Sequence, residues 1–311
     1  MRGGPVPPER FDHFMARANA AYYARGTFGQ DFITAPEITQ VFGELLGAWA
    51  KIVWQMLGSP DDIILAEAGP GRGVLMADAL RVWPQQNVHF IETSPALRAE
   101  QKHRVPQAHW HESLATIPDG PMILLANEFL DALPVRQFIR RPEGWQERFV
   151  EQHEYVEYPT DYELPDDPVG SVREVNEAAL AFCKALAARK AVGLFIDYGP
   201  TQSAAGESVQ AIRQGTYADL LSPLGEADLT AHVDFAAIKR TVHAQGPVKQ
   251  NYFLTALGLY QRSDKLAQHH PERALDLRLS VQRLTAPEAM GSLFKVLAIC
   301  PSHLPSLPGF E

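Results

Sequence analysis

A short glycine-rich segment follows an apolar run near the first quarter of the chain. Gly69, Gly71 and Gly73 stand in the sequence GPGRG, and Glu67 precedes the first of them by two residues. Glycines let a ligand approach the backbone closely, and the start of a helix offers N–H groups that lack intrahelical partners. The spacing therefore predicts a strand-to-helix turn that binds a nucleotide-type ligand.

The residues around the glycines decide between three kinds of nucleotide loop. A phosphate-binding loop needs Lys followed by Ser or Thr after its last glycine, but Val74 and Leu75 stand there. A dinucleotide fingerprint needs Gly or Ala at the position of Val74. The remaining pattern, acidic-x-Gly-x-Gly-x-Gly, is that of class I S-adenosylmethionine-dependent methyltransferases. That cofactor has no phosphate, and Glu67 would place negative charge near its cationic ammonium and sulfonium groups.

Polar residues follow the next apolar runs, where ligands of open α/β sheets bind. Glu92 is placed to accept both ribose hydroxyls, or else is a solvated acid at a strand end. Glu112 could accept from the adenine amino group, or lie on the surface as an ordinary glutamate. Asn127 and Glu128 lie where the reactive methyl group is expected, and we interpret them as functional.

These residues require an alternation of strands and helices to position them. Short apolar runs predict buried strands within 62–69, 87–93, 108–113, 120–128 and 191–199, and helices are predicted at 74–83 and 95–104. This alternation is typical of βαβ units and a parallel sheet. The fold class is therefore α/β, with a parallel sheet.

Further elements extend this core. Helices at 9–26 and 37–57 predict an N-terminal helical segment over 1–60, and Gly43 and Gly47 indicate close packing against a neighbour. We expect a loop at 26–37 and a β insertion at 136–170. The methyltransferase core with its additions would cover 61–135 and 190–311. Within these parts we expect a helix at 172–189, a loop at 199–227, a short strand and helix over 227–246, helices at 252–268 and 271–284, and a last strand at 292–300.

Composition excludes several classes of function. A formal net charge of −9 argues against charge-driven nucleic-acid binding. Cys183 and Cys300 stand in apolar surroundings and are expected to be small buried hydrophobes, too few for a zinc site. No metal is expected. We also expect no signal peptide and no transmembrane segment, which would leave the protein in a reducing bacterial cytoplasm.

Several segments resemble successive motifs of the MidA family, which includes a mitochondrial complex I assembly factor that symmetrically dimethylates an arginine of a core subunit. The resemblance extends from about residue 20 to residue 300 and rests on DFITAPEITQVFGELLGAW, EAGPGRGVLMADALR, ETSPALRAEQ, LLANEFLDALPVRQF, FIDYG, EADLTAHVDF and MGSLFKVLAI.

The resemblance implies a class I methyltransferase fold, which is Rossmann-like, with extra elements. It also implies a protein-arginine substrate, such as a respiratory-chain subunit or an equivalent. By position it implies a cofactor loop at Glu67, Gly69, Gly71 and Gly73, a ribose ligand at Glu92, and a cover formed by Thr34, Pro36 and Glu37. Asn127, Glu128 and Asp131 would form the catalytic edge.

The chain departs from the family in a short RGTFGQ stretch, in Glu112 where relatives often have Asp, and in QGTYADL. His232 and Asp234 offer a second constellation: either His232 accepts a proton, or Asp234 caps a helix and His232 packs beneath it. Glu128, with Asp131 or Glu37, is expected to hold the guanidinium of a substrate arginine. A small-molecule methyltransferase and a catalytically silent assembly scaffold remain alternatives, and the oligomeric state stays open.

Overall fold

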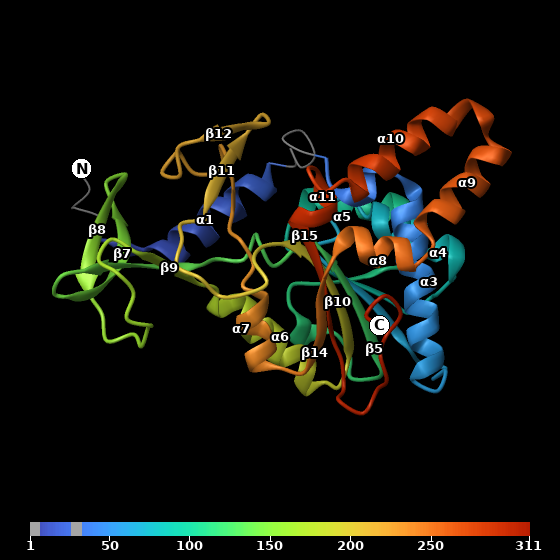
Figure 1. Cartoon of the computed structure of the whole chain (residues 1–311), viewed down its shortest axis with the longest axis horizontal. Helices are drawn as coiled ribbons and strands as arrows, with labels where there is room; N and C mark the ends of the chain where they lie inside the picture. Colours follow the sequence, from blue (N-terminus) through green and yellow to red (C-terminus); the bar gives the residue numbers. More distant parts are fainter. Residues whose placement is uncertain (1–6, 26–32) are drawn as a thin grey trace.

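A seven-stranded sheet forms the centre of the computed structural model, which describes residues 7–25 and 33–311 (Figure 1). Its strand order is β14-β15-β10-β5-β2-β3-β4. Five neighbouring strands run parallel: β10 (Val192–Tyr198), β5 (Met122–Asn127), β2 (Ile64–Ala68), β3 (Val88–Ile91) and β4 (His109–His111). β15 (Phe294–Ile299) and β14 (Ala244–Lys249) extend the sheet antiparallel. The predicted parallel α/β core is confirmed.

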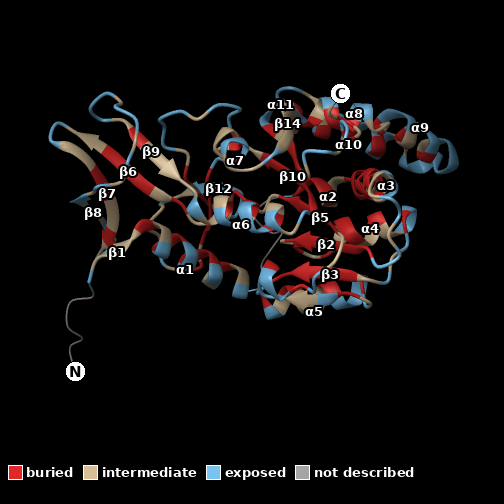
Figure 2. Cartoon of the chain, turned by 90° about the horizontal axis from the view of Figure 1, so that it is seen from below, coloured by how far each residue is buried: buried red, intermediate tan, exposed pale blue. Residues whose placement is uncertain are grey.

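Both faces of this sheet are buried, and the strand residues alternate between two hydrophobic clusters. Leu65, Ile123 and Leu125 pack with α3 (Gln40–Met56), α4 (Val74–Val82), α8 (Gln250–Ala256), α9 (Leu259–His269) and α10 (Ala274–Thr285). Ile64 and Leu124 instead pack with α6 (Glu177–Ala188) and α7 (Phe235–Thr241) on the opposite face. Figure 2 shows the buried strands between these helical layers. The result is a three-layer sandwich that leaves the strand ends to form a site.

A second sheet lies at one end of the molecule (Figure 1). It contains β6 (Arg136–Arg141), β7 (Gly144–Glu151), β8 (Glu154–Pro159) and β9 (Val172–Val175), and β1 (Glu9–Arg10) pairs with β7. The segment where a β insertion was expected, 136–170, thus contains the antiparallel strands β6, β7 and β8. α1 (Phe11–Ala24) lies between the two sheets and packs on a small sheet of β11 (Gln210–Arg213), β12 (Thr216–Ala218) and β13 (Asp228–Thr230).

Several predicted elements differ in their extent. The helix expected at 37–57 is divided at Thr39, whose extended backbone caps α3 and separates it from α2 (Ala35–Ile38). α2 also takes the end of the loop expected at 26–37, of which residues 26–32 lie outside the described ranges. Residues 172–175, expected to be helical, form β9 because they pair with β6, and Asn176 then caps α6.

Three more differences lie in the C-terminal half. The loop expected at 199–227 contains a β11–β12 hairpin, whose turn residues Gln214 and Gly215 both have positive φ. The helix expected at 252–268 is broken at Gly258, whose φ of 90° ends α8. β14 was not predicted, and α10 is followed by the short helix α11 (Met290–Leu293). The 3₁₀ turns η1 (Leu114–Thr116) and η2 (Pro271–Arg273) complete the described elements.

Gly43 and Gly47 allow α3 to lie directly against α4, as their spacing predicted. A Cβ at Gly43 would stand 2.8 Å from the carbonyl oxygen of Leu75. At Gly47 it would stand 2.4 Å from the carbonyl oxygen of Ala79 and 2.7 Å from its Cα. These neighbours are backbone atoms of the helix that follows the glycine loop, so the contact helps to fix that loop.

We therefore expect Gly47→Ala to destabilise the protein by about 1–3 kcal/mol, because α3 and α4 would have to separate. Thermal or urea unfolding followed by circular dichroism measures this change. Gly206→Ala is the matched control, since a Cβ there meets no atom within 4 Å. Equal stability of the two variants would contradict the role of close helix packing.

Candidate active site

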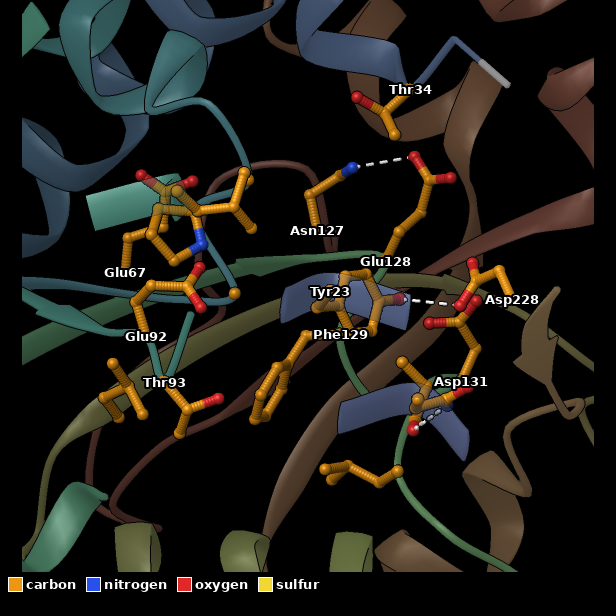
Figure 3. Close-up of a pocket in the computed structure, with 18 of the residues that line it drawn as sticks. Tyr23, Thr34, Glu67, Glu92, Thr93, Asn127, Glu128, Phe129, Asp131 and Asp228 are labelled. Carbon is orange, nitrogen blue, oxygen red and sulfur yellow. Dashed lines mark hydrogen bonds between the residues drawn. The ribbon is translucent and has the colours of Figure 1, made fainter. Parts of the chain in front are cut away.

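One cavity of about 440 Å³ lies at the carboxyl ends of β2, β3 and β5, the usual ligand position in open α/β sheets (Figure 3). Most of the site residues predicted from the sequence line this cavity, and they come from five separate segments of the chain. Those lining it are Thr34, Pro36, Glu37, Glu67, Gly69, Gly71, Glu92, Glu112, Asn127, Glu128 and Asp131. Gly73 is not among the lining residues. It starts α4, with a φ of 78°.

The glycine loop turns tightly from β2 into α4. Gly69, Gly71 and Gly73 all have left-handed backbones, with φ of 63°, 51° and 78°. The N–H of Gly73 donates to the carbonyl of Pro70 at 2.7 Å, which closes the turn. A Cβ on Gly69 would lie 3.0 Å from the ring of Phe129. Glycine is therefore required at this turn both by backbone conformation and by close contact.

Glu67 is buried beside this loop at the end of β2. Its Oε2 has no hydrogen-bond partner among the described residues. Burial raises the pKa of Glu67 to about 8, and the backbone N–H of Met76 offsets this only in part. An unpaired buried carboxyl at the cavity wall can accept from a cationic ligand group, which would restore its ionised form.

Glu92 ends β3 and is held by its neighbours. It accepts from the N–H of Ser94 at 2.7 Å and from Nε2 of Gln101 at 3.1 Å. Gln101 is fully buried, and its Nε2 also donates to the carbonyl of Gly71 at 2.7 Å. Gln101 thus links the glycine loop to the predicted ribose ligand. Sequence reasoning missed it, although a polar residue one turn after Leu97, on the buried face of α5 (Pro95–Arg104), was a usable signal.

Asn127 and Glu128 stand at the end of β5. Nδ2 of Asn127 donates to Oε1 of Glu128 at 2.8 Å, as Figure 3 shows. Glu128 adopts φ of 51°, a strained backbone for a residue other than glycine, of the kind that clusters at functional sites. Burial, and then the charge of Asp131, raise the pKa of Glu128 to about 8.

Two further acids lie close to Glu128. Burial raises the pKa of Asp131 to about 6, although a hydrogen bond with the Tyr198 side chain favours its ionised form. Asp228, the first residue of β13, accepts a hydrogen bond from the hydroxyl of Tyr23 on α1 at 2.9 Å. Glu128, Asp131 and Asp228 converge at one end of the cavity (Figure 3). Sequence reasoning missed Tyr23 and Asp228, although Asp228 stands in the quoted EADLTAHVDF segment.

Asp197, in the FIDYG segment, lies beneath these three acids and fixes the backbone that carries Asp131. Its Oδ2 accepts from the N–H groups of Leu130 and Asp131 at 3.0 and 3.2 Å, and Oδ1 accepts from the N–H of Tyr198. Asp197 is 1% exposed, and burial raises its pKa well above the ordinary range. The turn that carries Asp131 is therefore held from below by the carboxyl of Asp197.

The segment from Thr34 to Glu37 also lines the cavity. The N–H of Ala35 lies 3.4 Å from Oε1 of Glu128. Oε1 of Glu37 accepts from Nε of Arg72 in the glycine loop at 2.6 Å. These contacts place the segment next to both the glycine loop and the acidic cluster, while Asp31 and Phe32 of the same motif lie outside the described residues.

Other candidate residues lie apart from the cavity or at its margin. Asp234 caps α7 by accepting from the N–H of Ala237 at 2.8 Å. His232 is exposed, its ring lies edge-on to that of Tyr198 with the centroids 5.6 Å apart, and it does not line the cavity. Glu112 lines the cavity but its side chain is exposed, and its role toward adenine stays a prediction. Cys183 and Cys300 are buried free thiols, as expected.

Residues 7–25 and 33–311 contain no candidate metal centre and no candidate membrane span. No group of three or more His, Cys, Asp and Glu side chains is placed there to hold a metal ion. None of the helices in these ranges combines the length and apolarity that crossing a bilayer requires.

The cavity fits S-adenosylmethionine in its donor set. The glycine turn lets a ligand approach the backbone closely. Glu67 offers Oε2, which has no partner among the described residues, as an acceptor for an ammonium group. Glu92, at the end of the neighbouring strand β3, is placed to accept from ribose hydroxyls. Seven acids line the cavity, namely Glu37, Glu67, Glu92, Glu112, Glu128, Asp131 and Asp228, whereas Arg72 is the one cation among the described lining residues. Such a cavity favours a ligand with positive charge.

Comparison with known proteins agrees with this geometry. Residues 45–253 match a family described as S-adenosyl-L-methionine-dependent methyltransferase. The chain is 32% identical to the mitochondrial protein arginine methyltransferase NDUFAF7 homolog of Drosophila melanogaster, covering 98% of this chain and 84% of that protein. Identity to human NDUFAF7 is 31%, covering 91% and 77%. A Burkholderia thailandensis structure bound to S-adenosyl-homocysteine is 25% identical, with a TM-score of 0.86 and coverage of 97% and 90%.

The raised pKa of Glu67 predicts a specific pH dependence of stability. In the unfolded chain this carboxyl ionises above its ordinary pKa of 4.5, whereas the folded protein keeps it protonated up to about pH 8. The folded state therefore binds more protons in this window, and stability falls as pH rises through it.

We expect Glu67→Gln to be more stable than the wild type at pH 8 by about 1–3 kcal/mol, with a smaller difference near pH 5. Urea unfolding of the cofactor-free protein at both pH values measures this. Glu163→Gln, at an exposed loop position, should show no such difference. An equal effect of Glu67→Gln at both pH values would contradict the assignment.

Proposed function

Because the chain belongs to the MidA family of S-adenosyl-L-methionine-dependent methyltransferases, we propose that it methylates an arginine side chain of a protein. The observation that supports this acceptor is the group of Glu128, Asp131 and Asp228 at one end of the cavity. The single cation among the described lining residues, Arg72, is paired with Glu37 instead. A guanidinium would supply the missing positive charge, with several N–H donors in a planar fork.

One half of the cavity would bind the cofactor, and the other half would bind the methyl acceptor. When bound, S-adenosylmethionine supplies a methyl group on a positively charged sulfur. Gly69 and Gly71 would admit it to the backbone, Glu67 would accept from its ammonium, and Glu92 would accept from its ribose hydroxyls. Asn127 and Glu128 would then face the methyl group, and the segment from Thr34 to Glu37 would exclude water from it.

Glu128 is proposed to orient the acceptor. A guanidinium is protonated at ordinary pH, so its reacting nitrogen is a poor nucleophile until charge is drawn elsewhere. Carboxylates that accept from the outer N–H groups localise the positive charge on the far nitrogens. Asn127 fixes the Glu128 carboxyl through a 2.8 Å hydrogen bond, so that its second oxygen can face the arginine.

Asp131 and Glu128 are proposed to receive the proton that the nitrogen loses on methylation. Groups whose pKa lies near the working pH are suited to this task. The values of about 6 for Asp131 and about 8 for Glu128 lie in that range. A guanidinium between them would lower both pKa values, since an adjacent opposite charge favours the carboxylate.

The partner protein is proposed by analogy with the relatives. Their names describe mitochondrial protein arginine methyltransferases. We therefore propose a protein substrate, and within that class a respiratory-chain subunit or its bacterial equivalent. The two buried free thiols suit the reducing cytoplasm that we propose as the compartment.

Mass spectrometry of arginine methylation in cells with and without the gene tests this function. We expect one or a few methylated arginines to disappear in the deletion and to return with the wild-type gene but not with Glu128→Gln. An unchanged arginine methylome, together with S-adenosylmethionine binding by the purified protein, would direct attention to a different acceptor.

On the substrate protein so identified, we expect Glu128→Gln to lower kcat by about 100-fold or more, since it removes the ionisable group at the acceptor. Calorimetry should show S-adenosylmethionine affinity within about 3-fold of the wild type, because Glu128 faces the acceptor half. Glu163→Gln, in an exposed loop, is the matched control. Unchanged turnover of Glu128→Gln with intact cofactor binding would rule out this role.

The rate should also increase with pH. Asp131 and Glu128 act as carboxylates, and their raised pKa values of about 6 and about 8 keep them partly protonated at neutral pH. We expect kcat/KM to rise between about pH 6 and pH 8, and Glu128→Gln to remove the upper part of this rise. A flat profile in the wild type would contradict the requirement for ionised carboxyls.

A further inference from the structure

Arg72, between two glycines of the loop, is the one positive side chain among the described residues that line the cavity. We propose that Arg72 binds the α-carboxylate of the methionine part of S-adenosylmethionine, and that Glu37 holds the arginine in position to do so. The proposal rests on the cofactor of the proposed function, but it does not depend on arginine being the methyl acceptor.

The arginine is only partly used by its present contact. Its Nε donates to Oε1 of Glu37 at 2.6 Å. Among the described residues, its two Nη groups have no hydrogen-bond partner. The Arg72 side chain is 35% exposed, whereas that of Glu37 is 9% exposed. A guanidinium held at Nε in this way keeps both Nη groups available for a second carboxylate, which is the group it binds most strongly.

The backbone that carries Arg72 is fixed on both sides. Gln101 donates to the carbonyl of Gly71 at 2.7 Å, and Nη1 of Arg104 donates to the carbonyl of Arg72 at 3.0 Å. The hydrogen bond between Gly73 and Pro70 closes the same turn. With its backbone and its Nε both fixed, little side-chain entropy remains to be lost when the Nη groups bind a ligand.

The charge around the cavity requires such a contact. A ligand carboxylate that enters this acid-lined cavity is repelled by those acids that are ionised unless a cation meets it. The methionine part of the cofactor is a zwitterion, and the loop offers a complementary pair. Glu67 before the glycines carries the unpaired Oε2 that suits the ammonium. Arg72 within the glycines carries the Nη groups that suit the carboxylate.

The contact also links cofactor recognition to the cover. Glu37 belongs to α2, and the N–H of Ala35 in the same short helix faces Glu128. A carboxylate on Arg72 would stabilise the arginine in the position that Glu37 binds, and with it the cover. Ligands that lack the carboxylate would lose this contribution, so Arg72 makes the site selective for the intact amino-acid end.

Calorimetric titration with S-adenosylmethionine and with its decarboxylated form tests this assignment. The two ligands differ in the carboxylate alone, and both retain the amine and the adenosine. We expect the wild type to prefer S-adenosylmethionine by about 10- to 100-fold, the range for a charge-assisted hydrogen bond. Arg72→Gln should bind S-adenosylmethionine more weakly by the same factor and bind the decarboxylated form within about 3-fold of the wild type.

The controls separate recognition from structure. Arg81→Gln, at the exposed end of α4, should leave both affinities unchanged. Glu67→Gln should weaken both ligands, because both retain the amine. Equal loss of both ligands in Arg72→Gln, or no preference in the wild type, would overturn the proposal. If Arg72→Gln does not fold, the wild-type preference and Arg72→Lys give the same comparison, and none of these measurements requires a methyl acceptor.

Discussion

The carboxyl groups around the cavity are the constraint on which the rest of the site depends. Removing an ionised carboxyl from water is unfavourable unless a positive charge or N–H donors compensate it. Glu67, Asp131 and Asp197 are buried and Glu128 is half-buried, all with little cationic help, and each has a raised pKa as a result. The site therefore stores unfavourable interactions that cationic ligands relieve, and this favours a positively charged cofactor and a positively charged acceptor alike.

Rigid elements hold these groups in place. The glycine loop lies between β2 and α4, and α4 is fixed by its close contact with α3 at Gly43 and Gly47. On the acceptor side, Asn19 of α1 donates to the carbonyls of Ala132 and Leu229 and accepts from the N–H of Leu229. The donor half is thus built by local βαβ structure, whereas the acceptor half joins three distant segments.

This difference explains which site residues could be predicted from the sequence and which could not. Glu67, Glu92, Asn127 and Glu128 lie at the carboxyl ends of predicted strands, so a parallel sheet brings them together without further knowledge. Tyr23 and Asp228 could not be placed in this way, because they reach the cavity through tertiary contacts. The same holds for Gln101, which supports Glu92 and the glycine loop from behind the lining. Local errors have a similar origin: β9 forms because β6 is available to pair, and the divisions at Thr39 and Gly258 depend on single backbone conformations.

The hydrogen bonds that join Asn19 to Ala132 and Leu229 have a consequence for the order in which the parts of the molecule come together during synthesis. α1 leaves the ribosome before the residues to which Asn19 donates, because Ala132 and Leu229 are synthesised 113 and 210 residues later. The hydroxyl of Tyr23 likewise donates to Asp228, which is synthesised 205 residues later. Contacts of such sequence separation form late, after the local βαβ units that hold the glycine loop. The segments of the cofactor half are therefore synthesised, and can pack together, before the contacts of α1 with Ala132, Asp228 and Leu229 become possible.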